Sequence, residues 1–164
     1  PPFTGLMGSP AIAEPVPRAG VEAFYKVYAT RAAGRIADFL HDDVEWTISG
    51  PIDYLRFCGT HRGKAAVLDL IKRQVPAVLR VFSFVPDSIV VDGDRAAMLS
   101  RQSSKRAVDG RVISYRVANF MRFRDGKVIE NLSLLDSFDA VEQVLGHPLD
   151  LHAVRPPAAD RAVV

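Results

Sequence analysis

Residues 79–137 decide the fold and read LRVFSFVPDSIVVDGDRAAMLSRQSSKRAVDGRVISYRVANFMRFRDGKVIENLSLLDS. Three Asp-Gly pairs divide this stretch at nearly equal intervals: Asp92-Gly93, Asp109-Gly110 and Asp125-Gly126. Asp-Gly is a strong short-range signal for a β-hairpin, because both central positions of a tight type I′ turn require positive φ. The stretch therefore predicts four long antiparallel strands, at about 79–91, 94–106, 111–124 and 127–137.

The residues before this stretch carry helical spacing. Val21, Phe24, Tyr25 and Tyr28 recur at i, i+3, i+4 and i+7, which places them on one face of a helix. The same spacing predicts a short second helix, a third helix that ends before Pro76, and a short helix near the C-terminus. Their apolar positions are Ile36, Phe39 and Leu40; Val67, Leu70 and Ile71; and Phe138, Val141, Val144 and Leu145, with Gly146 as the last C-cap.

A brief strand, Val44 to Ile48, and an apolar loop, residues 52–62, separate the second and third helices. We expect this loop to form a lid or a pocket wall, because apolar side chains on a loop need a surface to cover. The order of elements predicts an α+β fold. Three helices from the N-terminal half pack on one face of a curved antiparallel sheet, and a short C-terminal helix follows.

The composition indicates one folded domain. The chain has 164 residues, of which 48% are hydrophobic and 24% charged, which suffices to bury a core. Cys58 is the single cysteine, which excludes an intramolecular disulfide and a zinc site built from cysteines. No apolar run reaches the roughly 18 residues of a membrane span, and no signal peptide is recognisable. We therefore expect a soluble cytoplasmic protein with no membrane partner.

Prolines mark the limits of the domain. They gather near the two ends, at Pro1, Pro2, Pro10, Pro15 and Pro17 and again at Pro148, Pro156 and Pro157. Because proline fixes φ and removes a backbone donor, these segments favour extended arms that become ordered only by docking. We expect a proline-rich arm at residues 1–17, a folded domain at 18–146 and a C-terminal tail at 147–164.

This arrangement resembles the nuclear-transport-factor-2-like (NTF2-like) superfamily, in particular its SnoaL-like and ketosteroid-isomerase-like branch. The matching stretches are Phe24-Tyr25, the run from Leu40 to Trp46, Gly59 to Lys64, Arg122 to Glu130, and Leu135-Asp136 running into Gln143 to Gly146. The resemblance implies a cone-shaped fold with a cavity between sheet and helices, and a homodimer joined through the outer sheet face. Because this superfamily contains isomerases, polyketide cyclases, hydrolases and non-catalytic domains, it does not fix the chemistry.

Three residues are candidate catalysts. Asp136 shares the even-numbered face of the last strand with Leu132 and Leu134, where burial would raise its pKa toward that of a general base. It also resembles the acidic position before the last helix of SnoaL-like cyclases, although it could simply cap that helix. Asn119 could stabilise an oxyanion or only satisfy buried backbone groups. Tyr25 resembles the oxyanion donor of isomerases, but its helical spacing also fits a core aromatic.

Further residues are expected to line the pocket: Trp46, Asp53, Tyr54, Phe57, His61, Tyr115, Val117 and Leu134. No pair of histidines has the spacing of metal ligands, so no metal site is expected.

Two departures from family patterns narrow the range of reactions that the chain could catalyse. Ile48 stands near the place of the ketosteroid isomerase base, and Arg101 is followed by Gln102 where an epoxide hydrolase would need Asp.

Two functions remain open on the sequence. The first is a cofactor-independent acid–base enzyme of isomerase, cyclase or hydrolase type that acts on an apolar carbonyl compound. The second is a non-catalytic ligand-binding or dimerisation module. Nucleic-acid binding is not favoured, although arginines recur along the predicted strands, because a solvated or dimeric sheet face explains the same charges. Phe120, apolar on that otherwise charged face, indicates a contact surface.

Overall fold

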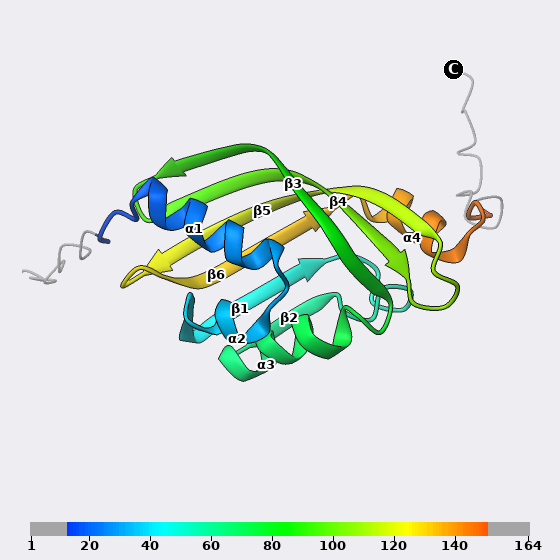
Figure 1. The fold of residues 1–164 in the computed structure, drawn as a ribbon, viewed down its shortest axis with the longest axis horizontal. Coiled ribbons are helices and arrows are strands. Elements are labelled where there is room, and N and C mark those ends of the chain that lie inside the picture. The colour runs from blue at the N-terminus through cyan, green and yellow to red at the C-terminus, as the bar shows by residue number, and fades with distance from the viewer. Residues whose placement is uncertain (1–12, 151–164) are drawn as a thin grey trace, which may run out of the picture.

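The computed structural model describes residues 13–150 and has the predicted α+β architecture (Figure 1). Six strands form one curved sheet in the order β2-β1-β6-β5-β4-β3. The strands are β1 (Leu40–Ser49), β2 (Gly59–Arg62), β3 (Leu79–Asp92), β4 (Arg95–Arg106), β5 (Val112–Arg124) and β6 (Lys127–Leu135). The helices are α1 (Arg18–Ala29), α2 (Ala33–Ala37), α3 (Lys64–Asp69), which continues into a π-helical turn (Leu70–Gln74), and α4 (Ser137–Leu145).

The three Asp-Gly hairpins are confirmed. β3 to β6 pair antiparallel in chain order, and the turn glycines Gly93, Gly110 and Gly126 all have positive φ. Asp125 also has positive φ, at 52°, as the first central position of its turn requires. These local signals specify four of the six strands.

The rest of the sheet differs from the prediction. β1 pairs parallel with β6, so the sheet is mixed rather than wholly antiparallel. β1 is also longer than the predicted strand at 44–48, and residues 59–62, predicted as loop, form the edge strand β2 against β1. Hairpin turns indicate only sequential neighbours, whereas the β1–β6 pair joins segments about 80 residues apart, which no local pattern specifies.

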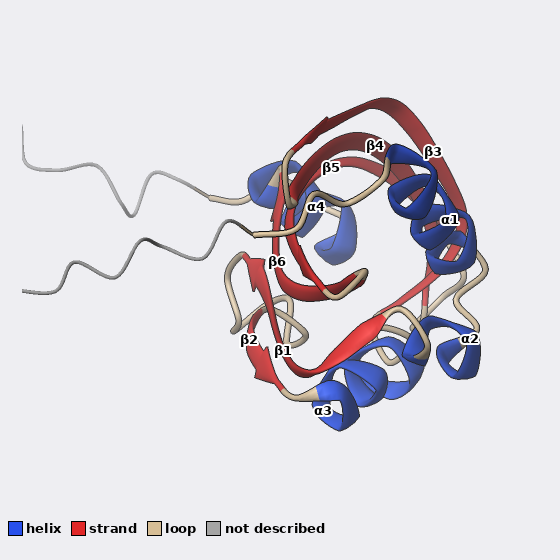
Figure 2. Ribbon diagram, turned by 90° about the vertical axis from the view of Figure 1, so that its left-hand side faces the viewer, coloured by secondary structure: helices blue, strands red, loops and turns tan. Residues whose placement is uncertain are grey.

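The helices cover the inner, concave side of the sheet, and α4 lies at one end (Figures 1 and 2). α1 buries the four residues predicted for its inner face, Val21, Phe24, Tyr25 and Tyr28. α2 is shorter than predicted, because Leu40 already belongs to β1. α4 ends at Gly146 with φ 81°, as expected for a glycine C-cap.

The predicted inner face of the last strand is wrong. Val128 and Ile129 are both buried, and the pairing of β5 with β6 shifts register between Arg122 and Phe123. This irregularity reverses the alternation, since each residue gained or lost in a ladder moves the side chains that follow to the opposite face. Asn131 and Ser133 therefore face the interior, whereas Glu130, Leu132 and Leu134 face outward.

Part of the N-terminal arm docks on the domain. Val16 is buried, and its backbone N–H donates to the carbonyl of Gly93 in the β3–β4 turn at 2.9 Å. Residues 1–12 and 151–164, which hold most of the predicted arm and tail, lie outside the described residues. No helix in the described part of the chain is long and apolar enough to cross a membrane.

Candidate functional site

A small inner cavity of about 50 Å³ lies between the sheet and the helices. Its walls are mostly apolar and aromatic, with polar groups from α1 and the strands. A cavity of this size has room for a few water molecules or one small chemical group. It is lined by Tyr28, Arg31, Ile48, Leu55, Phe57, Val75, Leu79, Val81, Gln102, Tyr115, Val117, Asn119, Ser133, Leu135 and Ala140.

One polar group of the cavity comes from neighbouring strands β5 and β6. The Asn119 amide donates to Ser133 Oγ at 2.7 Å and to Asn131 Oδ1 at 3.3 Å, and the Asn131 amide donates to the same Ser133 oxygen at 2.9 Å. Asn119 Oδ1 is buried with no hydrogen-bond partner among the described residues. A buried amide oxygen without a partner is costly, so this group is ready to accept a hydrogen bond from a ligand or a water.

A second polar group forms where α1 ends. Arg31 adopts the left-handed conformation with φ 57°, and its guanidinium carbon stands 4.4 Å from the centre of the Tyr28 ring. Arg31 Nη2 donates to Gln102 Oε1 on β4 at 3.2 Å, while its buried Nε has no partner among residues 13–150. The stacking and the hydrogen bond hold a positive charge at the cavity wall.

Tyr115 completes the polar wall. Its hydroxyl lies 3.0 Å from Ser104 Oγ, and both side chains are buried. Burial raises the pKa of the Tyr115 phenol, while the Ser104 hydrogen bond and the charge of Arg31 act in the opposite direction. The phenol is therefore neutral at physiological pH and serves as a hydrogen-bonding group rather than a base.

Four of the predicted site residues line the inner cavity: Phe57, Tyr115, Val117 and Asn119. Trp46 is 1% exposed and packs its ring against Tyr28 at 5.7 Å, so it belongs to the core beneath the wall. The loop after β1 contributes Leu55 and Phe57, which agrees with its predicted role as a pocket wall.

The other predicted lining residues lie elsewhere. Asp53 and Tyr54 are exposed, and the ring of His61 on β2 lies 3.1 Å from the carbonyl oxygen of Phe57. Leu134 is 41% exposed on the outer face, so its assignment to the pocket is wrong. The reversed alternation of β6 explains the error.

Asp136 is exposed and does not line the cavity. It occupies the N-cap position of α4, where its backbone carbonyl accepts from Ala140 at 2.9 Å but its side chain makes no capping hydrogen bond. The buried apolar surroundings expected for this side chain are absent, because Leu132 and Leu134 are also exposed. Its proposed catalytic role stays a prediction.

Tyr25 does not line the inner cavity with Asn119. It packs between α1 and β3, with its ring 6.3 Å from that of Phe84, and it borders a surface depression between those elements. Its hydroxyl is buried without a partner in the described chain, and burial, followed by the charge of Tyr28, raises its pKa well above the usual range. The structure therefore does not bring the three predicted catalysts together.

Among the polar lining residues, sequence reasoning missed Arg31, Gln102 and Ser133. A faint signal existed for Gln102, because Ser100, Gln102 and Ser104 form a polar row on alternate positions of β4. The alternation expected for β6 places the even-numbered residues inside, and therefore Ser133 outside, whereas Ser133 is buried. Arg31 follows a helix without any pattern, and only the left-handed turn of its backbone directs it to the cavity.

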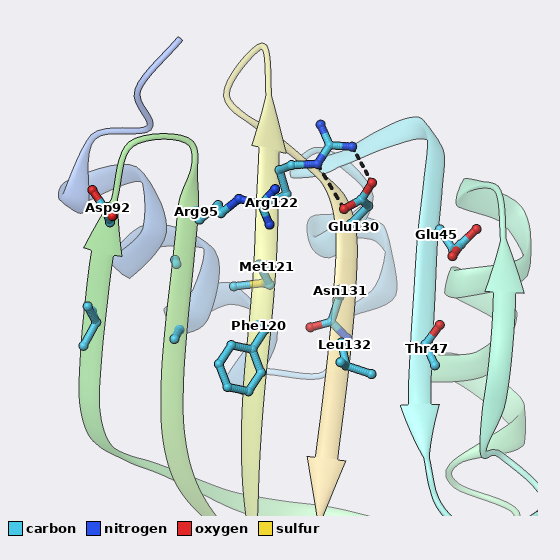
Figure 3. A pocket seen from close by; sticks show the side chains of 13 residues that line it. Glu45, Thr47, Asp92, Arg95, Phe120, Met121, Arg122, Glu130, Asn131 and Leu132 are labelled. Atoms are coloured by element: carbon cyan, nitrogen blue, oxygen red, sulfur yellow. Dashed lines mark hydrogen bonds and ion pairs between the residues drawn. The ribbon is translucent and has the colours of Figure 1, made fainter. Parts of the chain in front are cut away.

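A larger depression, the outer groove, lies on the side of the sheet away from the helices and has a volume of about 490 Å³ (Figure 3). Its charged side chains gather near the β5–β6 turn, and Phe120 and Leu132 lie further along the strands. Arg122 and Glu130 form a two-pronged ion pair, with Nε to Oε2 at 3.0 Å. The Arg122 hydrogen bond lowers the pKa of Glu130.

No group of three or more His, Cys, Asp or Glu side chains suited to a metal ion occurs within residues 13–150. No carboxylate and no histidine of the described residues lines the inner cavity. Its polar lining groups are amides, hydroxyls and one guanidinium.

Solved structures share this fold. A proposed isomerase from Rhodopseudomonas palustris matches with a TM-score of 0.71 and 34% identity, over 78% of this chain and 97% of that one. An NTF2-like protein from Burkholderia pseudomallei gives a TM-score of 0.68 and 22% identity, over 77% and 95% of the two chains. TerC, crystallised with polyporic acid, gives 0.67 and 22%, over 77% and 96%.

No curated protein matches the chain. The model of the SnoaL-like domain matches residues 21–131, which run from α1 into β6 and make up more than half of the sequence. The mixed sheet, the helices on its concave side and the solved NTF2-like relatives agree with that match. The chain belongs to the SnoaL-like domain family and has the NTF2-like fold.

Proposed function

We propose that the protein binds a small, largely apolar molecule in the inner cavity and holds its polar group against β5 and β6. The observation that carries this proposal is the buried Asn119 Oδ1 without a partner at the cavity wall. Ligand sites in proteins are mostly apolar with a few converging polar groups, and the aromatic and aliphatic walls here have that character.

Ser133 supplies a complementary group. Its oxygen accepts from both Asn119 and Asn131, and it donates no hydrogen bond among the described residues. Its proton is thus available for a carbonyl or similar oxygen, while Asn119 Oδ1 accepts from a donor. A ligand larger than the present cavity needs the wall to move. The π-helical turn Leu70–Gln74 directly precedes Val75, which lines the cavity. Such turns are frequent at functional sites, which supports a role for this part of the wall.

A cavity-filling variant tests this proposal. Val117→Phe adds volume on the inner face of β5, whereas Val112→Phe adds it at an exposed position of the same strand. Ligand-observed NMR with cyclopentanone, 2-cyclohexenone and benzoate should detect binding to the wild type and to Val112→Phe but not to Val117→Phe. Equal binding to the two variants, or none to the wild type, would refute the inner cavity as the site.

Isomerase activity without a cofactor is the second candidate. It is supported by the Rhodopseudomonas palustris relative at 34% identity, a proposed isomerase that the match covers almost completely. An acid–base mechanism needs a base, and Asp136 follows Leu135, which lines the cavity. In this candidate function, a movement at the start of α4 brings the carboxylate of Asp136 to the bound ligand.

The test is conversion of 3-cyclohexenone to 2-cyclohexenone, followed by NMR in D2O so that exchange of α-protons is also seen. Turnover by the wild type that falls at least 100-fold in Asp136→Asn, but not in the exposed control Asp53→Asn, supports this candidate. Equal turnover in Asp136→Asn removes Asp136 as the base. Binding without exchange or conversion leaves the ligand-binding function alone.

We also propose a homodimer through the outer sheet face. Phe120 is 51% exposed, and Leu99, Leu132 and Leu134 are exposed on neighbouring strands. A contiguous apolar surface of this kind is typical of an association site. Phe120→Glu should convert a dimer to a monomer in analytical ultracentrifugation, while the exposed control Val108→Glu should not. A monomeric wild type would contradict the proposal.

A further inference from the structure

Among the described residues that line the inner cavity, Arg31 is the one with a charged side chain. Its only hydrogen bond to another side chain in the described structure goes to a neutral amide, that of Gln102. No Asp or Glu among residues 13–149 forms an ion pair with it. A guanidinium at a largely apolar wall without a counterion has an unmet preference for an anion.

The guanidinium is also fixed in place. The left-handed backbone at Arg31 ends α1, the Tyr28 ring lies against the guanidinium, and Gln102 holds Nη2. A non-glycine residue in this conformation is uncommon and persists where the surrounding structure enforces it. The buried Nε has no partner among the described residues and retains a donor for a further acceptor. This is a pre-organised donor rather than a mobile surface charge.

We infer that the inner cavity binds a small organic acid, whose carboxylate pairs with the guanidinium of Arg31. The inference rests on the proposed ligand-binding function and adds the chemical class of the ligand. A carboxylate suits a guanidinium because two oxygens can accept two parallel N–H groups. The apolar walls of Leu55, Val81 and Val117 suit the hydrocarbon part, which needs the wall to move because the present cavity has room for about one small group.

Most other polar groups of the wall suit an anion, and the exception is Asn119 Oδ1, which accepts hydrogen bonds. Gln102, Tyr115 and Ser133 all carry N–H or O–H groups that can donate hydrogen bonds to a carboxylate oxygen, and no carboxylate among residues 13–150 lines the cavity to repel it. A neutral ligand would leave the Arg31 charge uncompensated in the complex. A cationic ligand would face it directly.

Matched acids and amides test the inference on the wild-type protein without any variant. Butyrate and butyramide have the same skeleton, as do benzoate and benzamide, and each pair differs in charge. Isothermal titration calorimetry at pH 7 should show each acid binding at least about ten-fold more tightly than its amide. Amides that bind as well as the acids would overturn the anion inference and leave the ligand-binding function intact. If none of the four binds, both are overturned.

The variant Arg31→Gln locates the effect. It keeps a polar side chain of similar reach but removes the charge, whereas Arg35→Gln removes an exposed arginine on α2, away from the cavity. The preference for benzoate over benzamide should disappear in Arg31→Gln and persist in Arg35→Gln. Circular dichroism checks that each variant folds. A preference retained in folded Arg31→Gln would overturn the assignment to Arg31.

Discussion

Arg31 Nη2 donates a 3.2 Å hydrogen bond to Oε1 of Gln102, which lies 71 residues further along the chain. The bond joins the end of α1 to the inner face of β4 across the wall of the cavity. It explains how an arginine with no ion pair among residues 13–149 is held in a partly buried position. Because Gln102 contacts the guanidinium directly, a charge introduced at position 102 would act on Arg31 at close range.

Gln102→Glu should abolish anion binding. The new carboxylate stands where the amide now accepts from Arg31, so it neutralises the guanidinium and repels a ligand carboxylate. Benzoate affinity measured by calorimetry should fall at least about ten-fold.

Gln102→Leu is the matched control for that change. It removes the acceptor but adds no charge, so benzoate binding should persist, while the free energy of unfolding falls by about 1 kcal/mol. If Gln102→Glu bound benzoate as the wild type does, Gln102 and Arg31 would not share the binding site.

Tyr25→Phe should leave the free energy of unfolding unchanged or raise it by about 1 kcal/mol, because the hydroxyl is buried without a partner among residues 13–150. Burial raises the pKa of Tyr25 in the folded state, so the stability linked to its neutral form is lost as pH rises above the unfolded value near 10. Urea unfolding from pH 8 to 11 should therefore show a weaker alkaline loss in the variant.

The exposed Tyr54 provides the control, since Tyr54→Phe should not alter how the free energy of unfolding falls between pH 8 and 11. This experiment also tests the sequence-based role of Tyr25 as an oxyanion donor. If the phenol contacts a ligand, Tyr25→Phe weakens ligand binding, whereas a core residue between α1 and β3 does not affect it. A clear loss of stability in Tyr25→Phe would show that the hydroxyl has a partner.

Gly50→Ala should be destabilising because of Cys58. A Cβ added at Gly50 would stand 2.7 Å from the Cys58 Sγ, closer than van der Waals contact allows. Relief of such overpacking costs about 1–3 kcal/mol, measured by thermal or urea unfolding. Burial raises the pKa of the Cys58 thiol to about 11, so this side chain is a neutral packing group.

A double-mutant cycle isolates the contact. In the background Cys58→Ala the sulfur is absent, so Gly50→Ala should cost markedly less than in the wild type. Gly34→Ala on α2 is the control, because a Cβ there meets nothing within 4 Å, and alanine in a helix gains roughly 0.5–1 kcal/mol over glycine. Additive effects in the cycle would contradict the predicted clash.

The Arg122–Glu130 pair predicts a small acid-dependent loss of stability. The Arg122 hydrogen bond lowers the pKa of Glu130 in the folded state. The stabilisation that the pair gives the folded state is therefore present above the pKa of Glu130 in the unfolded chain, about 4.3. It is lost as the pH falls through the lower pKa that Glu130 has in the folded state. Because Glu130 is half exposed, Glu130→Gln should cost less than about 1 kcal/mol at pH 7.

The cost of Glu130→Gln should shrink as the pH is lowered below about 4. Arg122→Gln should give a similar effect, and the double variant should cost no more than either single one, because the two side chains act as one pair. Urea unfolding at several pH values provides the data. A cost that stays constant down to pH 2.5 would mean that the ion pair is not its source.

The sequence by itself determined the parts of the fold that depend on neighbouring residues. The Asp-Gly turns require positive φ, which glycine adopts freely, so they specified three hairpins and four strands. The spacing of Val21, Phe24, Tyr25 and Tyr28 specified the buried face of α1, because an amphipathic helix buries its apolar side. On β5 the regular alternation placed Tyr115, Val117 and Asn119 inside.

Only the tertiary structure decided the parallel pairing of β1 with β6, the face of β6 and the composition of the cavity. A register shift near Arg122 and Phe123 reversed the alternation, which exchanged Leu134 for Ser133 at the site. Arg31 and Gln102 meet across 71 residues. Such contacts depend on strand pairing between distant segments and on single irregular residues. Local periodicity carries no information on either, because it is averaged over neighbours and assumes an unbroken ladder.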